Sequence, residues 1–143
     1  MYRIIYLSSA TTKFTNDEIL TLLRNSRKNN EVNDITGLLL YSDGNFLQII
    51  EGKSKPLKKL YDKISVDPRH KNIIKVFEGK VSSRIYPNWK MGFNSIDKKF
   101  NPQVVKDDIL YENYDPIINK EDTIASIFIQ TFLKSNKDKI LIK

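Results

Sequence analysis

The chain has 143 residues, of which 40% are hydrophobic and 29% charged, and its formal net charge is +7. This length fits one domain with a core, and no apolar run approaches the roughly 20 residues of a membrane span. The absence of cysteine excludes disulfides and thiolate metal sites, and a single histidine, His70, excludes a multi-histidine metal site.

The first residues lack the succession of charged leader, apolar segment and cleavage site that marks a secretory signal. We therefore expect a cytoplasmic protein with no membrane attachment. The lysines are scattered, without an arginine-rich helix or a basic strand interleaved with aromatic residues. This distribution argues against a nucleic-acid partner and leaves an acidic protein partner open.

Alternation over residues 2–8 predicts a strand with Ile4 and Tyr6 on one face and Arg3 and Ile5 on the other. The capping box from Thr15 to Glu18 then predicts the start of a helix. The apolar stripe of this helix ends in polar residues, namely Ser26, Arg27 and Asn30. The polar end indicates either fraying into a loop or a ligand facing the sheet.

Asp43 and Gly44 stand between two apolar runs, which predicts a two-residue β-hairpin turn. Period-two alternation then places Gln48 on the same face as Phe46 and Ile50. If that face is the core, the Gln48 amide needs polar partners, because an unpaired buried donor costs about 1–3 kcal/mol. The partner is either a neighbouring side chain or helix end, or a bound ligand.

A second helix and two further strands are predicted after the hairpin. Ser54 and Pro56 signal a second amphipathic helix ending near Asp67, and residues 73–81 and 89–96 read as the fourth and fifth strands. The order βαββαββ predicts an α+β, ferredoxin-like fold, a mixed five-stranded sheet with two helices on one face. His70 lies in the loop before the fourth strand, where a lone histidine is typically a surface hydrogen-bonding group.

From Asp97 the composition changes, so we predict a domain over residues 1–96 and a linker with a C-terminal helical extension over 97–143. Residues 104–111 predict a short helix. A second, amphipathic helix carries Ile124, Ile127, Phe128, Thr131 and Phe132. This stripe needs an apolar surface, either the uncovered sheet face or another subunit, and makes a homo-oligomer an expectation.

Taken together, these residues resemble the BLUF domain, a blue-light sensor that uses flavin. The similarity covers about residues 1–96 and rests on the order and spacing of Tyr6, Ser8, Ala10, Arg27, Asn30, Ile35-Thr36-Gly37, Phe46, Gln48, Glu51-Gly52, Asp67, Arg69-His70, Arg84, Trp89 and Met91-Gly92.

The resemblance implies a flavin, FAD with FMN as the alternative, between the two helices that pack on the sheet. It implies cofactor contacts from Tyr6, Ser26, Arg27, Asn30, Phe46, Gln48, Asp67, Arg69 and His70. It also implies a photoactive group of Tyr6, Gln48, Trp89 and Met91, in which excited flavin oxidises Tyr6, the proton passes by way of Gln48, and the Gln48 hydrogen bonds rearrange.

The same resemblance implies a sensor without catalytic activity of its own. Fewer than fifty residues follow Asp97, too few for an attached cyclase or phosphodiesterase domain of usual size. The signal would pass through the fifth strand and the C-terminal helices to an unidentified downstream protein partner or a change of oligomer.

Two other functions stay open from the sequence. One is a ferredoxin-like enzyme of the acyl-phosphate hydrolase kind, with Arg27 and Asn30 binding an anion and water. It leaves Gln48 unexplained and lacks a glycine loop to cradle phosphate. The other is a light-independent binding module, for example a nucleic-acid binder, which would need stacking aromatics and basic residues on the exposed sheet face.

Overall fold

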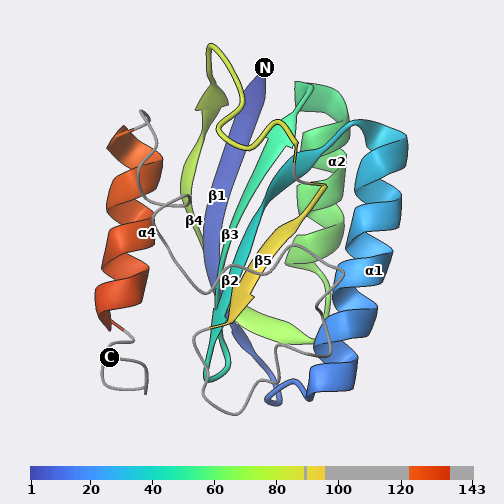
Figure 1. The fold of residues 1–143 in the computed structure, drawn as a ribbon, viewed down its shortest axis with the longest axis vertical. Coiled ribbons are helices and arrows are strands. Elements are labelled where there is room, and N and C mark those ends of the chain that lie inside the picture. The colour runs from blue at the N-terminus through green and yellow to red at the C-terminus, as the bar shows by residue number, and fades with distance from the viewer. Residues whose placement is uncertain (89, 96–122, 136–143) are drawn as a thin grey trace.

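The computed structural model describes residues 1–88, 90–95 and 123–135 (Figure 1). Its elements, in chain order, are β1 (Tyr2–Ala10), α1 (Asn16–Asn33), β2 (Thr36–Ser42), β3 (Asn45–Gly52), α2 (Ser54–Ser65), β4 (His70–Lys80), β5 (Gly92–Ser95) and α4 (Thr123–Ser135). The strands form one sheet in the order β4-β1-β3-β2-β5. The β2–β5 pair is parallel and the other pairs are antiparallel. The predicted ferredoxin-like α+β fold is confirmed.

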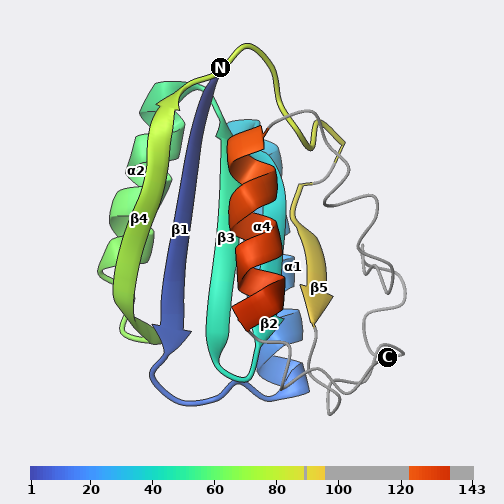
Figure 2. The same ribbon diagram turned by 90° about the vertical axis from the view of Figure 1, so that its left-hand side faces the viewer.

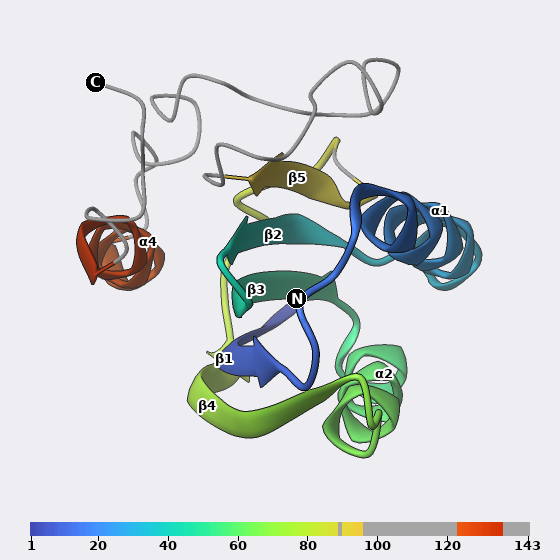
Figure 3. The same cartoon turned by 90° about the horizontal axis from the view of Figure 1, so that it is seen from below.

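The sheet is covered on both faces. Helices α1 and α2 lie on one face and α4 lies on the other (Figures 1 and 3). Under α1 and α2 the buried core includes Ile4, Ile19, Leu23, Ile50 and Leu57. Under α4 a second core includes Ile5, Leu40, Ile49, Ile129 and Phe132. Alternate residues of β1 and β3 therefore serve two cores, as period-two alternation requires.

Helix α4 lies across the middle of the sheet, over β3 (Figure 2). The predicted apolar stripe on this helix is wrong in part, because Ile124 and Ile127 are exposed while Ile129 and Phe132 are buried. Apolar residues surround much of this helix, so their spacing did not determine which side meets the sheet. Of the two surfaces predicted to receive the helix, the second sheet face of the same chain does so.

The hairpin between β2 and β3 has the register that its turn predicts. Ser42 pairs with Asn45, and this register places Gln48 opposite Leu39. Asp43 and Gly44 both have positive φ, 47° and 86°, as a two-residue turn matched to the strand twist requires.

The start of β5 differs from its prediction, since the strand begins at Gly92 rather than at residue 89. Met91 therefore lies immediately before the strand, and Trp89 falls outside the described residues. The predicted linker and the short helix over 104–111 fall outside them as well. Over the described ranges no helix is long and apolar enough to cross a bilayer.

A buried ion pair on the sheet face that α4 covers holds the segment that follows β4. The Nε atom of Arg3 donates to Oε2 of Glu51 over 2.8 Å, and both side chains are almost fully buried. The backbone amides of Ile85 and Tyr86 also donate to the Glu51 carboxylate, over 2.9 to 3.0 Å. Glu51 thereby ties β3 to the chain that leads toward β5.

Candidate functional site

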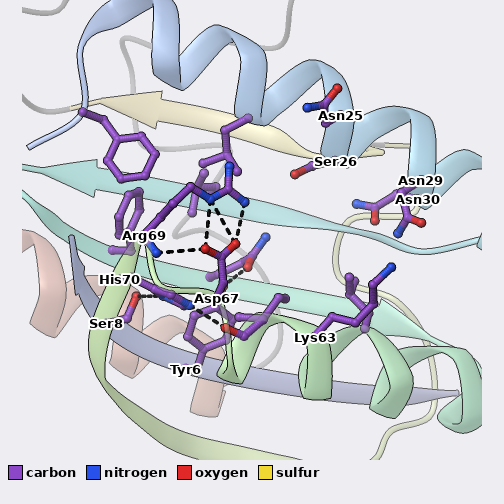
Figure 4. Close-up of a pocket in the computed structure, with 17 residues that line it drawn as sticks. Tyr6, Ser8, Asn25, Ser26, Asn29, Asn30, Lys63, Asp67, Arg69 and His70 are labelled. Atoms are coloured by element: carbon purple, nitrogen blue, oxygen red, sulfur yellow. Dashed lines mark hydrogen bonds and ion pairs between the residues drawn. The ribbon is translucent and has the colours of Figure 1, made fainter. Parts of the chain in front are cut away.

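A cavity of about 410 Å³ lies between α1 and α2, with the sheet as its floor (Figure 4). Its size falls in the range of small-molecule sites. Apolar side chains line part of it, namely Phe14, Leu22, Leu39, Phe46, Leu60 and Ile64. The polar lining comes from Tyr6, Ser8, Asn25, Ser26, Asn29, Asn30, Gln48, Lys63, Asp67, Arg69 and His70.

Tyr6 and Gln48 are directly opposite each other on β1 and β3 and form a hydrogen-bonded pair in the cavity wall. The Tyr6 hydroxyl donates to Oε1 of Gln48. The Gln48 amide nitrogen in turn donates to the sulfur of Met91 over 3.5 Å. All three side chains are at most 8% exposed. The two sheet residues and Met91 therefore form one buried chain of polar contacts that borders the cavity.

Burial raises the pKa of Tyr6 far above the usual value for a phenol, and the nearby Tyr61 and Asp67 raise it further. The Tyr61 ring packs edge-on against Tyr6, with 5.7 Å between the ring centroids. Tyr6 is consequently a neutral phenol at physiological pH, and its hydroxyl proton is available for donation to Gln48.

The C-terminal half of α1 supplies further amide groups and a hydroxyl group to the cavity (Figure 4). Ser26 and Asn30 line it, as the resemblance implied, together with Asn25 and Asn29, which the sequence reasoning missed. Positions 22, 25, 26, 29 and 30 recur at the spacing of one helix face, so the missing pair could have been found by extending the polar stripe. The amide nitrogen of Asn30 donates to the Lys90 carbonyl over 2.6 Å.

Charged side chains stand near the loop that joins α2 to β4. Asp67 accepts from the Arg69 guanidinium over 2.5 to 3.0 Å, and this hydrogen bond lowers the pKa of Asp67. His70 contacts the Ile64 carbonyl through Nε2 at 2.6 Å and the Ser8 hydroxyl through Nδ1 at 2.9 Å. Because a carbonyl only accepts, His70 Nε2 carries a proton and donates it to Ile64.

Lys63 is a second cation beside the cavity, from the last turn of α2. Its side chain is exposed, and the sequence reasoning missed it because it is one of many scattered lysines. Lys63 lies on the side of Asn29 and Asn30, apart from the Arg69–Asp67 pair (Figure 4). The two cations therefore stand at different parts of the cavity wall, and each could meet an anionic group of a ligand.

Arg27 does not line the cavity, although the resemblance implied a cofactor contact there. Its guanidinium instead donates to the Met91 carbonyl, from Nε over 3.0 Å and from Nη2 over 2.8 Å. Arg27 follows Ser26 directly, and one residue rotates a helix by about 100°, which turns this side chain away from the cavity face.

The donor set as a whole fits a flat heterocycle with polar edges and an anionic tail. Apolar side chains would contact its faces, amides from α1 and β3 would bond its edge, and the cations of the lining would meet an anionic group. The described residues hold no group of three or more histidines, cysteines or carboxylates that could bind a metal ion.

Residues 1–92 match the family described as BLUF, sensors of blue-light using FAD. The chain belongs to the BLUF family. It is 35% identical over 97 residues to the photoactivated adenylate cyclase subunit alpha of Euglena gracilis, which covers 66% of this chain and 10% of that protein. It is 30% identical over 112 residues to the blue light- and temperature-regulated antirepressor BluF of Escherichia coli K12, covering 76% of this chain and 27% of that protein.

Solved BLUF structures share the fold. The dark-state structure of BlrB, a BLUF protein, superposes with a TM-score of 0.66 at 26% identity, covering 94% of this chain and 96% of that one. A bacterial light-regulated adenylyl cyclase superposes with a TM-score of 0.68 at 29% identity, covering 96% of this chain and 35% of that one. The chain spans only about a tenth of the photoactivated cyclase of Euglena and about a quarter of the antirepressor.

Family membership identifies this chain as a flavin-based blue-light sensor domain. The geometry of the cavity also argues against the acyl-phosphate hydrolase alternative, because that function needed Arg27 and Asn30 together at an anion site. The two residues do not share the cavity, since Arg27 is bonded to the Met91 carbonyl outside its lining.

Proposed function

We propose that the cavity between α1 and α2 holds the flavin and that Tyr6 and Gln48 are the pair that responds to light. The observation that carries this proposal is the buried contact chain from the Tyr6 hydroxyl through the Gln48 amide to Met91. In it a proton donor and an amide able to both donate and accept meet at the cavity wall.

The Gln48 amide supports a flavin at this site because its NH₂ group lacks a strong hydrogen-bond acceptor. Among the described residues, its NH₂ group has only the thioether of Met91 as an acceptor, and a thioether is a weak one. An acceptor at the edge of a flavin ring would satisfy this buried group better. Asn30 and Ser26 would bond the ring's carbonyl and imide groups, and Phe46 would contact the ring from β3.

The phosphate end of the cofactor would lie near Arg69 and His70, beside Asp67 (Figure 4). These groups would meet the first phosphate of either FAD or FMN. We propose FAD, which the family description names, with FMN as the alternative. Reconstitution with FAD, FMN and riboflavin tests both points. Weaker binding of riboflavin than of FMN would support the phosphate contact, and the ratio of the FAD and FMN dissociation constants separates the two cofactors.

When bound, the flavin supplies absorption of blue light and, once excited, an acceptor for one electron. Tyr6 would give up that electron together with its hydroxyl proton, which leaves along the existing hydrogen bond to Gln48 Oε1. Both return to Tyr6 when the charges recombine. Gln48 would then hold a different set of hydrogen bonds, reached by rotation or by tautomerisation of its amide.

A matched pair of tyrosine variants tests the assignment. We expect Tyr6→Phe to bind flavin and lose the light-induced change in its absorption spectrum, because packing survives without the hydroxyl. The control is Tyr61→Phe, whose ring packs against Tyr6 but does not line the cavity. It should retain both properties. An undiminished photocycle in Tyr6→Phe would exclude this residue as the donor.

For the output, we propose that the change at Gln48 passes through Met91 and Trp89 to β5 and the C-terminal helices, and from there to a protein partner or an oligomer.

Helix α4 exposes Ile124 and Ile127, by 47% and 54%, and these two would mediate self-association. Light scattering in darkness and under blue light, on the chain and on Ile127→Lys, tests this. A monomer in both states would exclude the oligomer and leave a protein partner as the output. A cytoplasmic location remains a prediction of the sequence.

A further inference from the structure

Helix α1 holds the backbone at the start of β5 through two side chains. Arg27 donates twice to the Met91 carbonyl, over 3.0 and 2.8 Å, and Asn30 donates to the Lys90 carbonyl over 2.6 Å. The two residues are three apart, so they lie on neighbouring positions of one helix side. Two consecutive carbonyls directly before Gly92 are thereby fixed to α1.

Met91 is held from two directions. Its carbonyl accepts from Arg27, and its sulfur accepts from Gln48 over 3.5 Å, while the side chain is 1% exposed. A hydrogen bond from a guanidinium is charge-assisted and strong, whereas a thioether is a weak acceptor. The Arg27 contact, more than the sulfur contact, therefore determines where Met91 lies.

We propose that Arg27 is a positioning residue that fixes Met91 against Gln48, so that a rearrangement of Gln48 is passed to the start of β5. This inference rests on the proposed roles of Tyr6 and Gln48. Arg27 itself touches neither the cavity nor the responsive pair. Arg27 acts on the transfer of the change from Gln48 to β5. Without Arg27, Gln48 still changes its hydrogen bonds, but the position of Met91 no longer changes with them.

The composition of the chain offers a direct probe. The sequence contains two methionines, Met1 and Met91, so labelling the methionine methyl groups with ¹³C gives two NMR signals. Met1 is 45% exposed and Met91 is buried, which separates the two signals. Spectra of the flavin-loaded full chain in darkness and under blue light then report the position of Met91.

The test variant is Arg27→Gln and the matched control is Arg24→Gln, an exposed arginine on the same helix. In Arg27→Gln we expect the dark Met91 signal to move toward that of Met1. We also expect its light-induced shift, scaled to the fraction photoconverted, to fall at least about threefold, as loss of a charge-assisted bond implies. The visible light-induced change and flavin affinity should stay within about twofold, because the cavity lining is untouched.

The conservative variant Arg27→Lys keeps the charge but has one donor nitrogen where Arg27 uses two, so it should give an intermediate Met91 response. It also carries the test if Arg27→Gln does not fold. An Arg27→Gln protein whose Met91 signal matches the parent in darkness and in light would overturn the proposal. So would a large loss of flavin affinity with an intact Met91 response, which would make Arg27 a cofactor ligand. If the parent chain shows no visible light response, the proposed function fails, and the dark Met91 signal alone still tests the anchor.

Discussion

Replacing Glu51 with glutamine removes the charge from the centre of a buried network while keeping the size of the side chain. The carboxylate accepts Arg3 Nε over 2.8 Å and the amides of Ile85 and Tyr86 over 2.9 to 3.0 Å. A glutamine offers one oxygen, so its NH₂ group must face either Arg3 or the two backbone amides. In both orientations donors meet donors, and the Arg3 charge stays buried without its counter-charge.

Breaking a buried ion pair from one side costs about 3–5 kcal/mol, a large part of the roughly 5–15 kcal/mol that stabilises a domain. With a urea m-value of about 2 kcal/mol/M, we expect the midpoint of Glu51→Gln to fall by about 2 M. The control is Glu31→Gln, an exposed position that should change stability by less than about 0.5 kcal/mol. A Glu51→Gln midpoint equal to that of the control would refute the assigned role of the network.

Three further predictions concern the cavity. Asn30→Ala should raise the dissociation constant for flavin by about tenfold, since it leaves polar groups of the ring unpaired, whereas Asn33→Ala on the exposed end of α1 should not; equal affinities in isothermal titration would contradict this. The raised pKa of Tyr6 predicts that absorbance titrations of the folded chain and of Tyr6→Phe coincide between about pH 9 and 11, and an extra tyrosine titrating in the parent would refute it. The pKa of Asp67 is lowered, mainly by the Arg69 side chain, so this pair should stabilise the fold above the unfolded pKa of 3.8 and lose that stabilisation as the pH falls through the lower folded pKa. Urea unfolding from about pH 5 to pH 2.5 should therefore show a smaller loss of unfolding free energy in Asp67→Asn than in the parent, and an equal loss in both would count against the pair.

The placement of Tyr6 and Gln48, the pair proposed to respond to light, was predictable because two local rules act together. The Asp43-Gly44 turn fixes the register of β2 on β3, and strand alternation then puts Gln48 on the face under α1 and α2. Alternation alone also places Tyr6 on that face of β1. Their direct pairing across β1 and β3 is a finding of the structure, because strand order and register between segments so far apart do not follow from alternation.

The remaining features depend on contacts between segments far apart in sequence. Arg27 is adjacent to cavity residues along the chain, yet its partner is a carbonyl 64 residues away. The face of α4 that meets the sheet was similarly undetermined, because apolar residues such as Ile127 and Ile129 point to different sides of one helix. In both cases the side chain's role follows from the element that packs against it, which periodicity does not identify.

The visible absorption spectrum decides whether this chain is a flavin sensor switched through Tyr6 and Gln48. The chain, reconstituted with flavin, should give a flavin spectrum that shifts slightly to the red under blue light and returns in darkness. Bound flavin whose spectrum does not respond to light would contradict the roles of Tyr6 and Gln48, and failure to bind flavin after reconstitution would contradict the site itself.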